Sequence, residues 1–577
     1  MMIHNNEIRD ILNQVADLME INGENRFRVR AYREAARIVE AMSEQVSKMV
    51  EAGEDLTRYR GIGKDMAAKI SEIAETGTLR QLKELGAQVP PSLLDLMKVP
   101  SLGPRKISHI YKTLAVTTLE ELESAAIQNK IAELNGFGEK TQQKILDSLQ
   151  RIKKSGETRL LWSDAQPFAM SLKEYLSKIK GAKKVIVAGS FRRGKETVGD
   201  LDILATCSPG GEQDLMEAFV RFEGVKNILA HGKTKSSVIL RSGLQVDLRI
   251  VARASYGAAL HYFTGSKAHN IAVRKLGIER GYRINEYGVY EGEKRIAGRT
   301  EKEVYASVGL PFIEPELREN LGEIEAAEDG RLPVLVKKSD IRGDLHAHTR
   351  RTDGHGSLKE MAEAAKALGY EYLAITEHSQ KVAMAGGLNE KEVRAHMENI
   401  DRVNQELKGF RLLKGMEVDI LADGSLDLPD SVLKDLDLAV CSVHYQQRLD
   451  RKKQTDRIIR AMDNPNMDIL GHPTSRLINT RDPMEIDLER IIEAAKERKV
   501  VIELNAQPDR LDLPHNYCKM AAELGVKIAL STDAHSTENL NLMENGIIAA
   551  RRGWLTKADI INTRPLSRLR KLLRRSF

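Results

Sequence analysis

From about residue 340 onward, short apolar runs typical of β-strands alternate with amphipathic helical segments, and this alternation restricts the possible folds most strongly. Helical segments such as 487–499 follow the runs, which lie at 372–378, 412–420, 436–444, 467–473, 500–507 and 526–535. Repeated strand–helix units build a parallel sheet, and this series is long enough to close into a barrel. The sequence therefore predicts an α/β barrel in the C-terminal part of the chain.

Histidine and carboxylate side chains are concentrated near the C-terminal ends of these strands, which in a barrel gather on one rim. A lone histidine after a strand is more often a hydrogen-bonded core or rim residue. Six histidines and three carboxylates spread over successive units favour a metal centre instead, and such a mixture suits zinc, manganese or iron. The candidate ligands are His346, His348, Asp353, His378, Glu417, His444, His472, Asp533 and His535.

Other polar residues flank these motifs. Glu377 adjoins His378 and is interpreted as a residue that supports a ligand rather than a ligand itself. His355 could be a tenth participant in the metal site, but the sequence favours a loop contact, and we expect His396, within a helix, to lie on the surface. Three arginines follow ligand motifs and could contact a phosphate or be solvated loop charges, two alternatives that stay open: Arg350, Arg351 and Arg476.

Up to about residue 150 the pattern is helical throughout. A glycine turn that leads into a helix occurs three times, at 59–70, 99–110 and 134–145, and these units resemble helix-hairpin-helix elements. Glycines let backbone N–H groups at a helix N-terminus approach a phosphate. One copy could equally be a helix pair that only packs, but three copies favour binding to the DNA backbone. The candidate DNA-binding residues are Gly61, Gly63, Lys64, Lys69, Gly103, Gly136 and Gly138.

Between about 151 and 255 the pattern changes to strands around helices, with strands predicted at 185–189, 202–206, 237–241 and 245–251. Asp200 and Asp202 are two residues apart and therefore point to the same side of one strand, and a later strand supplies Asp247. Three such carboxylates could hold two Mg²⁺ or Mn²⁺ ions for phosphoryl transfer. Gly189 and Ser190 offer backbone donors to a triphosphate, and Arg193 offers a charged fork.

The Gly-Ser turn, the Asp-x-Asp pair and the later strand aspartate are the nucleotidyltransferase pattern of family X DNA polymerases. The whole chain resembles a bacterial or archaeal family X DNA polymerase with a C-terminal PHP (polymerase and histidinol phosphatase) domain. The resemblance implies a multidomain α/β fold: an N-terminal helix-hairpin-helix region, a nucleotidyltransferase palm with a mixed sheet, and a distorted (β/α)7 PHP barrel.

The resemblance also implies domain boundaries. The expected parts are a helical DNA-end-binding domain at 1–80, a fingers-like helix-hairpin-helix subdomain at 81–150, the palm at 151–255, a thumb-like dNTP-binding subdomain at 256–320, a linker at 321–340 and the PHP domain at 341–577.

For the palm, the resemblance implies that Asp200 and Asp202 bind both metals, and that Asp247 binds the catalytic metal and activates the primer 3′-hydroxyl. Residues 262–266 match the family's YFTGS turn, in which Tyr262 and Phe263 flank the sugar and select against a 2′-hydroxyl. The complete set of implied dNTP contacts is Gly189, Ser190, Arg193, Arg159, Tyr262, Phe263, Gly265 and Asn270.

For the C-terminal part, the nine candidate ligands match the PHP pattern at every position, which implies a cluster of up to three Zn²⁺, Mn²⁺ or Fe ions. In relatives this domain gives 3′→5′ exonuclease activity, and sometimes cleavage at abasic sites or removal of a 3′-phosphate. The implied substrates are gapped or nicked primer–template DNA and dNTPs, in gap filling of the base excision repair type.

Lys69 matches the place of a Schiff-base lysine that removes a 5′-deoxyribose phosphate in relatives of the DNA polymerase beta type. That chemistry needs a lowered lysine pKa. Asp65 lies four residues earlier on the same helix and favours the charged amine. The sequence therefore favours a phosphate contact over lyase activity.

The composition is consistent with this assignment. The net charge of +6 permits a nucleic-acid partner, and no apolar run is long enough for a membrane helix. The N-terminus does not resemble a signal peptide, and the three cysteines are far apart, so we expect a cytoplasmic monomer without disulfides. The basic tail at 567–577 could bind DNA or cap the barrel.

Two alternatives from other functional classes remain. The chain could be a DNA-binding scaffold with a degenerate polymerase core, which the complete aspartate set disfavours. The C-terminal domain could instead be a small-molecule phosphatase, which its fusion to DNA-binding helices disfavours.

Overall fold

The structure is a computed structural model that describes Ile3 and residues 5–42, 45–59, 61–97, 99, 102–155 and 159–573. The chain divides into two compact units, which are described separately. The first comprises Met1–Thr158 with Asn320–Gly322, and the second comprises Arg159–Glu319 with Glu323–Phe577. Arg60, Pro100 and Ser101 of the predicted glycine-turn units, and residues 574–577 of the basic tail, lie outside the described residues.

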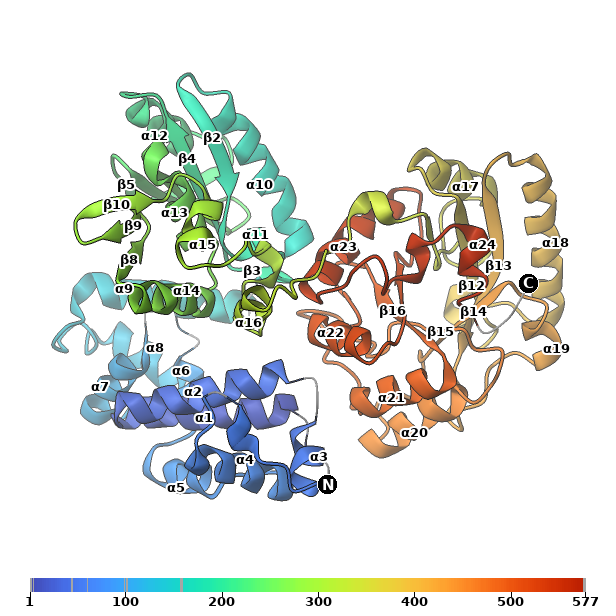
Figure 1. Cartoon of the computed structure of the whole chain (residues 1–577), viewed down its shortest axis with the longest axis horizontal. Helices are drawn as coiled ribbons and strands as arrows, with labels where there is room; N and C mark the ends of the chain where they lie inside the picture. Colours follow the sequence, from blue (N-terminus) through green and yellow to red (C-terminus); the bar gives the residue numbers. More distant parts are fainter. Residues whose placement is uncertain are drawn as a thin grey trace. The chain divides into compact units, whose positions relative to one another are not determined.

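The first unit is helical, as the sequence predicts (Figure 1). One hydrophobic core joins its helices, with the α1–α2 pair contributing Leu12, Met19 and Ala35. The helices are α1 (Asn5–Asn22), α2 (Arg26–Ala41), α3 (Val46–Glu51), α4 (Lys64–Thr76), α5 (Arg80–Gln88), α6 (Leu93–Leu96), α7 (Pro104–Leu114), α8 (Leu119–Ile127) and α9 (Gly138–Ser155).

Each predicted glycine turn leads into a helix. Gly63 and Gly103 directly precede α4 and α7, and α9 begins at Gly138. Gly63 and Gly103 have negative φ angles, and a Cβ atom at either position would meet nothing within 4 Å. Neither strain nor packing therefore requires glycine there, and its effect is to leave the amides of the helix N-terminus uncovered.

The second unit begins with a mixed five-stranded sheet in the order β2-β4-β7-β6-β5, in which β4 and β7 are parallel and the other neighbours antiparallel. α10 and α12 pack on one face through a core that includes Leu172, Phe219 and Leu248. The elements are β1 (Leu160–Leu161), α10 (Trp162–Ser177), β2 (Ala182–Val187), α11 (Gly189–Arg192), β3 (Thr197–Val198), β4 (Asp200–Cys207), α12 (Glu212–Val220), β5 (Val225–His231), β6 (Lys235–Leu240) and β7 (Gln245–Ile250).

A smaller α/β region follows, with an antiparallel sheet in the order β10-β9-β8. Its elements are α13 (Tyr256–Thr264), α14 (Lys267–Glu279), β8 (Tyr282–Asn285), β9 (Gly288–Glu291), β10 (Lys294–Ala297), α15 (Glu301–Ser307) and α16 (Glu323–Glu328). Residues 321–340, expected as a linker, include α16, whose Ile324 and Ala327 pack into the core of this region together with Leu335.

The remainder of the second unit is a nearly closed barrel of seven parallel strands in sequential order, β11 to β17. A parallel bridge between Ala347 and Ala534 links the chain beyond the first strand to the chain beyond the last. The strands are β11 (Gly343–Asp344), β12 (Tyr372–His378), β13 (Arg411–Asp419), β14 (Leu438–Ser442), β15 (Ile469–Leu470), β16 (Val501–Asn505) and β17 (Ile528–Ser531).

Helices lie outside these strands (Figure 1). They are α17 (Leu358–Ala367), α18 (Glu390–Glu406), α19 (Asp430–Leu433), α20 (Arg451–Ala461), α21 (Leu488–Arg498), α22 (His515–Glu523) and α23 (Met543–Arg552), whereas α24 (Leu566–Leu569) packs against the interior of the barrel. Inside the barrel, Leu569 and Leu573 from the basic tail pack against residues near the strand starts, such as Tyr372 and Leu438. The described part of the tail therefore caps the end opposite the predicted ligands.

Among the described helices, none combines the length and apolar character that crossing a membrane requires.

Candidate active sites

The three predicted catalytic aspartates lie together on the palm sheet. Asp200 and Asp202 are on β4, and Asp247 on β7 is the register partner of Asp202 across the parallel β4–β7 pair. Residues in register on adjacent strands face the same side of a sheet. The predicted convergence of the three carboxylates is therefore present in the structure.

The electrostatics of this cluster favour cation binding. Burial, together with repulsion from Asp200 and Asp247, raises the pKa of Asp202 to about 6. Burial and Asp247 also raise the pKa of Asp200, which the charge of Arg159 opposes. For Asp247, burial is outweighed by hydrogen bonds from Lys235, Gln245 and Ser237, so its pKa is lowered. Carboxylate oxygens that repel one another in this way fit Mg²⁺ or Mn²⁺ as ligands.

Gly189 places the expected triphosphate-binding turn directly beside these carboxylates. It begins the short helix α11 after β2, with φ of +63°. A Cβ atom there would lie 2.6 Å from Oδ2 of Asp202, so only glycine fits. The partly exposed Ser190 follows in the first turn of α11. The backbone of the turn thus lies directly against the Asp202 carboxylate of β4.

Arg193 joins this turn to the predicted YFTGS segment. Its Nη1 donates to the carbonyl oxygen of Thr264, and its Nε donates to Oε1 of Glu319 at 3.0 Å. Gly265 has φ of +66°, and a Cβ there would lie 3.2 Å from Nη1 of Arg193. Sequence reasoning missed Glu319, because no local motif marks a partner 126 residues from Arg193.

The remaining predicted nucleotide contacts surround this arrangement. Tyr262 and Phe263 make an edge-to-face pair with centroids 5.1 Å apart, and the Arg249 guanidinium lies 4.5 Å from the Phe263 centroid. Asn270 Nδ2 donates to the Tyr262 carbonyl at 2.7 Å. Arg159 is held by Thr197, to whose hydroxyl and carbonyl oxygens it donates at 3.0 Å, on the side of the site nearer Asp200.

The nine predicted ligands of the barrel gather at the C-terminal ends of the strands. Three overlapping groups have potential ligand atoms within 4.8 Å of one another, and His472 Nε2 joins them at 2.9 Å from Glu417 Oε1. The groups are His348, Asp353, His378 and His535; then His346, His348 and Asp533; then His378, Glu417 and His444.

The chemistry of these side chains fits metal ions. His346 Nε2, both ring nitrogens of His348 and His472 Nδ1 are buried and have no hydrogen-bond partner among the described residues. Such atoms are uncommon in proteins unless an ion or water satisfies them. Burial also lowers the pKa of His348 to about 4, which keeps its imidazole in the neutral form that binds metals.

Two carboxylates that sequence reasoning did not single out orient ligand imidazoles. Glu503 on β16 contacts Nδ1 of His346 at 2.7 Å, and Asp419 on β13 contacts Nδ1 of His444 at 3.1 Å. Each contact fixes one ring nitrogen and leaves Nε2 for an ion. Strand periodicity could have indicated Asp419, because it lies two residues after Glu417 and so on the same side of β13.

The surface location predicted for His396 is wrong. Its side chain is 3% exposed, and Nε2 lies 3.7 Å from Oε1 of Glu377. The helical spacing carried the missed signal, because His396 lies between the buried Val393 and Ile400 at intervals of three and four residues. Glu377 itself accepts hydrogen bonds from the hydroxyl groups of Thr349 and Thr352, and so supports the loop that carries Asp353.

The flanking residues have protein partners. Arg350 pairs with Glu360 and Arg351 with Glu392, both at solvent-exposed positions. The side chain of His355 is exposed, and its backbone N–H donates to the His535 carbonyl at 2.7 Å. Arg476 is largely buried and pairs with Glu196 at 2.7 Å.

In the first unit, Lys69 Nζ lies 2.7 Å from Oδ2 of Asp65 and 5.0 Å from the Tyr32 ring centroid. Burial lowers the pKa of Lys69, but Asp65 and Tyr32 outweigh this effect and raise it. The charged amine is therefore favoured, which opposes Schiff-base chemistry. The phosphate contact of Lys69 stays a prediction.

Family models match each part of this architecture. A helix-hairpin-helix domain matches residues 3–79, a SAM-like helix-hairpin-helix tandem 93–151, the DNA polymerase beta palm 162–249, the DNA polymerase beta thumb 259–319 and the PHP domain 344–507. The fold and the two sites thus define a polymerase beta-like nucleotidyltransferase joined to a PHP domain.

Similar proteins cover the same parts. The chain is 39% identical to the "DNA polymerase/3′-5′ exonuclease PolX" of Bacillus subtilis over 579 residues, 100% of both chains. It is 25% identical to DNA polymerase lambda of Arabidopsis thaliana over 54% of this chain and 62% of that protein. A probable phosphatase of Thermoanaerobacter sp. is 32% identical over 38% of this chain and 89% of its own length. The chain belongs to the family X DNA polymerases that carry a C-terminal PHP domain.

Replacing Asp202 by Asn should stabilise the metal-free protein. The carboxyl's pKa rises from 3.8 to about 6 on folding, so its ionised form destabilises the fold above pH 6, and the penalty disappears as the pH falls below 4. We expect the free energy of unfolding of Asp202→Asn to exceed that of the parent by roughly 1–3 kcal/mol at pH 7.5 in EDTA, and by less at pH 4.5. Urea unfolding measures this difference.

Asp214→Asn, at an exposed palm position, is the matched control. An equal response of both variants would contradict the prediction.

Metal binding to the barrel should release protons. Burial lowers the pKa of His378, but Glu417 and Asp353 outweigh this effect and raise the pKa to about 10. In the same way, Glu417 and Asp419 outweigh burial and raise the pKa of His444 to about 9. Both imidazoles must lose a proton to bind an ion, so affinity should rise with pH between about 6 and 9. Calorimetric titration with Mn²⁺ or Zn²⁺ in buffers of different ionisation enthalpy counts the protons. His355→Ala should release the same number, and pH-independent affinity would exclude this account.

Proposed function

We propose that this chain fills short gaps during DNA repair of the base excision type, adding nucleotides at the palm and removing them from 3′ ends at the barrel. The observation that carries the proposal is the presence in one chain of two clusters of side chains that could hold metal ions, the palm cluster beside a turn suited to a triphosphate. We expect the protein to act as a monomer in the cytoplasm, where its three cysteines, none of them in a disulfide, would stay reduced.

At the palm, Asp200 and Asp202 would hold two Mg²⁺ or Mn²⁺ ions and Asp247 the one nearer the primer. Bound ions of this kind stabilise the attacking and leaving oxygens of phosphoryl transfer. Gly189, Ser190 and Arg193 would bind the incoming triphosphate, with Arg159 as a further phosphate contact. Asp247 would also take up the proton of the primer 3′-hydroxyl, for which its lowered pKa keeps it ionised.

The YFTGS segment would bind the sugar and base of the incoming nucleotide. Tyr262 and Phe263 would flank the sugar and exclude a 2′-hydroxyl, Gly265 would allow close approach, and Asn270 would reach the groove edge of the base pair. Its hydrogen bond to the Tyr262 carbonyl supports this role, because it holds Asn270 and Tyr262 in one arrangement.

At the barrel, the nine ligands would hold up to three Zn²⁺, Mn²⁺ or Fe ions, which lower the pKa of a bound water for attack on phosphorus. Glu503 and Asp419, which contact Nδ1 of His346 and of His444, would leave Nε2 of each ring to bind an ion. We propose the 3′ end of DNA as the substrate, with abasic sites or a 3′-phosphate as further substrates of the same centre. The similarity of the barrel to a probable phosphatase supports a small-molecule phosphatase as the second candidate.

Single substitutions should separate the two activities. Asp200→Ala should reduce primer extension on gapped DNA with Mn²⁺ by at least about 10³-fold and spare 3′-end degradation, because it removes a metal ligand of one centre alone. His346→Ala should have the opposite effect. Asp214→Ala, on an exposed palm helix, should change neither. Extension that survives Asp200→Ala would refute the polymerase assignment, and degradation that survives His346→Ala would refute the nuclease assignment.

We further propose that the glycine turns bind DNA phosphates through helix N-termini. The uncovered amides at Gly63 and Gly103 support this, with Gly61, Lys64, Lys69, Gly136 and Gly138 as neighbouring contacts. Such contacts position DNA without reading its sequence.

Replacing Gly63 by Ser tests this proposal. A serine at this position caps the helix with its own hydroxyl and changes stability by only a few tenths of a kcal/mol. It would, however, occupy the amides that a phosphate needs, so affinity for gapped DNA should fall several-fold with an unchanged melting temperature. Fluorescence anisotropy at fixed salt measures the affinity. Gly86→Ser, within α5, where an added Cβ meets nothing closer than 3.5 Å, is the control. Equal affinity of Gly63→Ser and the parent protein would contradict the phosphate contact.

A further inference from the structure

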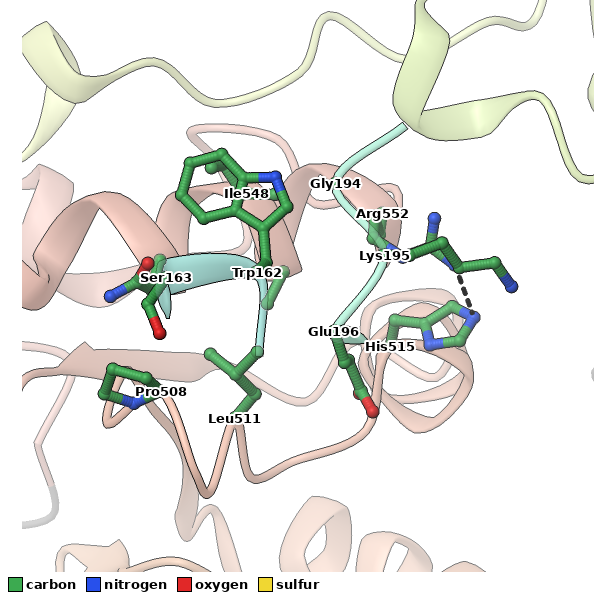
Figure 2. Close-up of a pocket in the computed structure, with 12 residues that line it drawn as sticks. Trp162, Ser163, Gly194, Lys195, Glu196, Pro508, Leu511, His515, Ile548 and Arg552 are labelled. Carbon is green, nitrogen blue, oxygen red and sulfur yellow. Dashed lines mark hydrogen bonds between the residues drawn. The ribbon is translucent and has the colours of Figure 1, made fainter. Parts of the chain in front are cut away.

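A short palm segment, residues 193–199, connects the proposed triphosphate-binding turn to Asp200 and packs against the barrel. Figure 2 shows Gly194 and Glu196 of this segment near Ile548, Arg552 and His515 of the barrel. Gly194 has φ of +63°, and a Cβ there would lie 2.2 Å from Cγ2 of Ile548. The space left between them is about 10 Å³, room for roughly one water molecule, so the contact is a packed interface rather than a ligand pocket.

Arg552, the last residue of α23, holds one end of this segment. Its side chain is 2% exposed. Nη1 donates to the Arg193 carbonyl oxygen at 3.0 Å and to Oε1 of Glu319 at 3.2 Å. The same Glu319 oxygen accepts from Arg193 Nε at 3.0 Å. Arg552 therefore contacts the backbone of Arg193 directly, and Glu319 links the side chains of the two arginines.

Three cations gather at this junction, next to the proposed triphosphate-binding turn. Arg193, Lys195 and Arg552 all lie within 3.6 Å of the carboxylate of Glu319. The described hydrogen bonds of Arg193 use Nε and Nη1, which leaves Nη2 as a donor for a phosphate oxygen.

The barrel also holds the other end of the segment. Arg476, expected from the sequence either to contact phosphate or to be solvated, instead pairs with Glu196 at 2.7 Å. Its guanidinium is fixed by the carbonyl oxygens of Arg510 and Leu511. Asn479 donates to the Arg159 carbonyl at 2.8 Å. Barrel side chains thus hold the connection between the triphosphate turn and the catalytic strand at several points.

We propose that the barrel positions the nucleotide-binding turn of the palm, with Arg552 as a positioning residue for nucleotidyl transfer that acts through Glu319 and Arg193. This inference rests on the proposed role of Arg193 in binding the triphosphate. It assigns the barrel a role in nucleotide addition that is separate from its own metal centre.

Single-nucleotide gap filling by the full-length protein tests the inference. Arg552→Ala should raise the dNTP concentration for half-maximal rate about ten- to a hundredfold, because a displaced Arg193 binds the triphosphate poorly. The maximal rate should change within about threefold. Arg552→Lys should restore part of the loss, since an ammonium can still reach Glu319. Arg498→Ala, an arginine of α21 paired with Asp463, should leave all values unchanged.

A double-mutant cycle separates positioning from a general structural effect. In an Arg193→Ala background, Arg552→Ala should cause no further loss, because it acts through Arg193. Additive losses, or an unchanged half-saturating dNTP concentration in Arg552→Ala, would overturn the inference. If Arg193→Ala itself leaves that concentration unchanged, the proposed triphosphate site fails instead.

Melting temperature and 3′-end degradation report on folding in every variant. Should Arg552→Ala not fold, Ile548→Ala loosens the same segment at Gly194 and should raise the half-saturating dNTP concentration in the same direction. An unchanged value in both Ile548→Ala and Arg552→Lys would equally overturn the inference.

Discussion

Both centres concentrate ionisable groups where burial disfavours charge, and they resolve this conflict differently. In the palm, three carboxylates face one another with Lys235 as a nearby cation, so repulsion remains and the pKa of Asp202 rises. In the barrel, imidazoles alternate with carboxylates, and Glu417 alone lies within 3.6 Å of five histidines: His346, His348, His378, His444 and His472. In the barrel, carboxylates and imidazoles thus offset one another's charge, whereas in the palm the carboxylates mainly repel one another.

Local patterns predicted the parts of the fold that depend on periodicity. The apolar run at 372–378 coincides with β12, and the nine barrel ligands converge because strand ends must meet on one rim. Partners distant in sequence could not be predicted, because spacing does not show which strands become neighbours. Glu503 contacts His346 across 157 residues, and Arg552 contacts the Arg193 carbonyl across 359. The misplacement of His396 was avoidable, since its helical spacing matched a buried face.

Three glycines explain how separate parts of the chain approach Arg193 so closely. Gly189, Gly194 and Gly265 all have positive φ angles. A Cβ at these positions would meet a carboxylate oxygen of Asp202, a methyl group of Ile548 and the guanidinium of Arg193, respectively. The missing side chain leaves room for close approach at each position: β4 approaches at Gly189, the barrel at Gly194, and Arg193 meets the YFTGS segment at Gly265. Sequence analysis singled out Gly189 and Gly265 from family motifs, whereas Gly194 has a role only in the context of the barrel.

The helix that carries Arg552, α23, also packs against two strands of the barrel. α23 lies against β16 and β17 because Gly546 leaves room, and a Cβ there would lie 2.6 Å from Leu530 and 2.7 Å from Ala506. β17 in turn leads directly to Asp533 and His535. The position of Arg552 and the positions of two barrel ligands therefore depend on the same packed layer, and a change in its volume would shift both. Nucleotide addition and removal are opposing reactions, and in this chain the palm turn and the barrel cluster share one structural support.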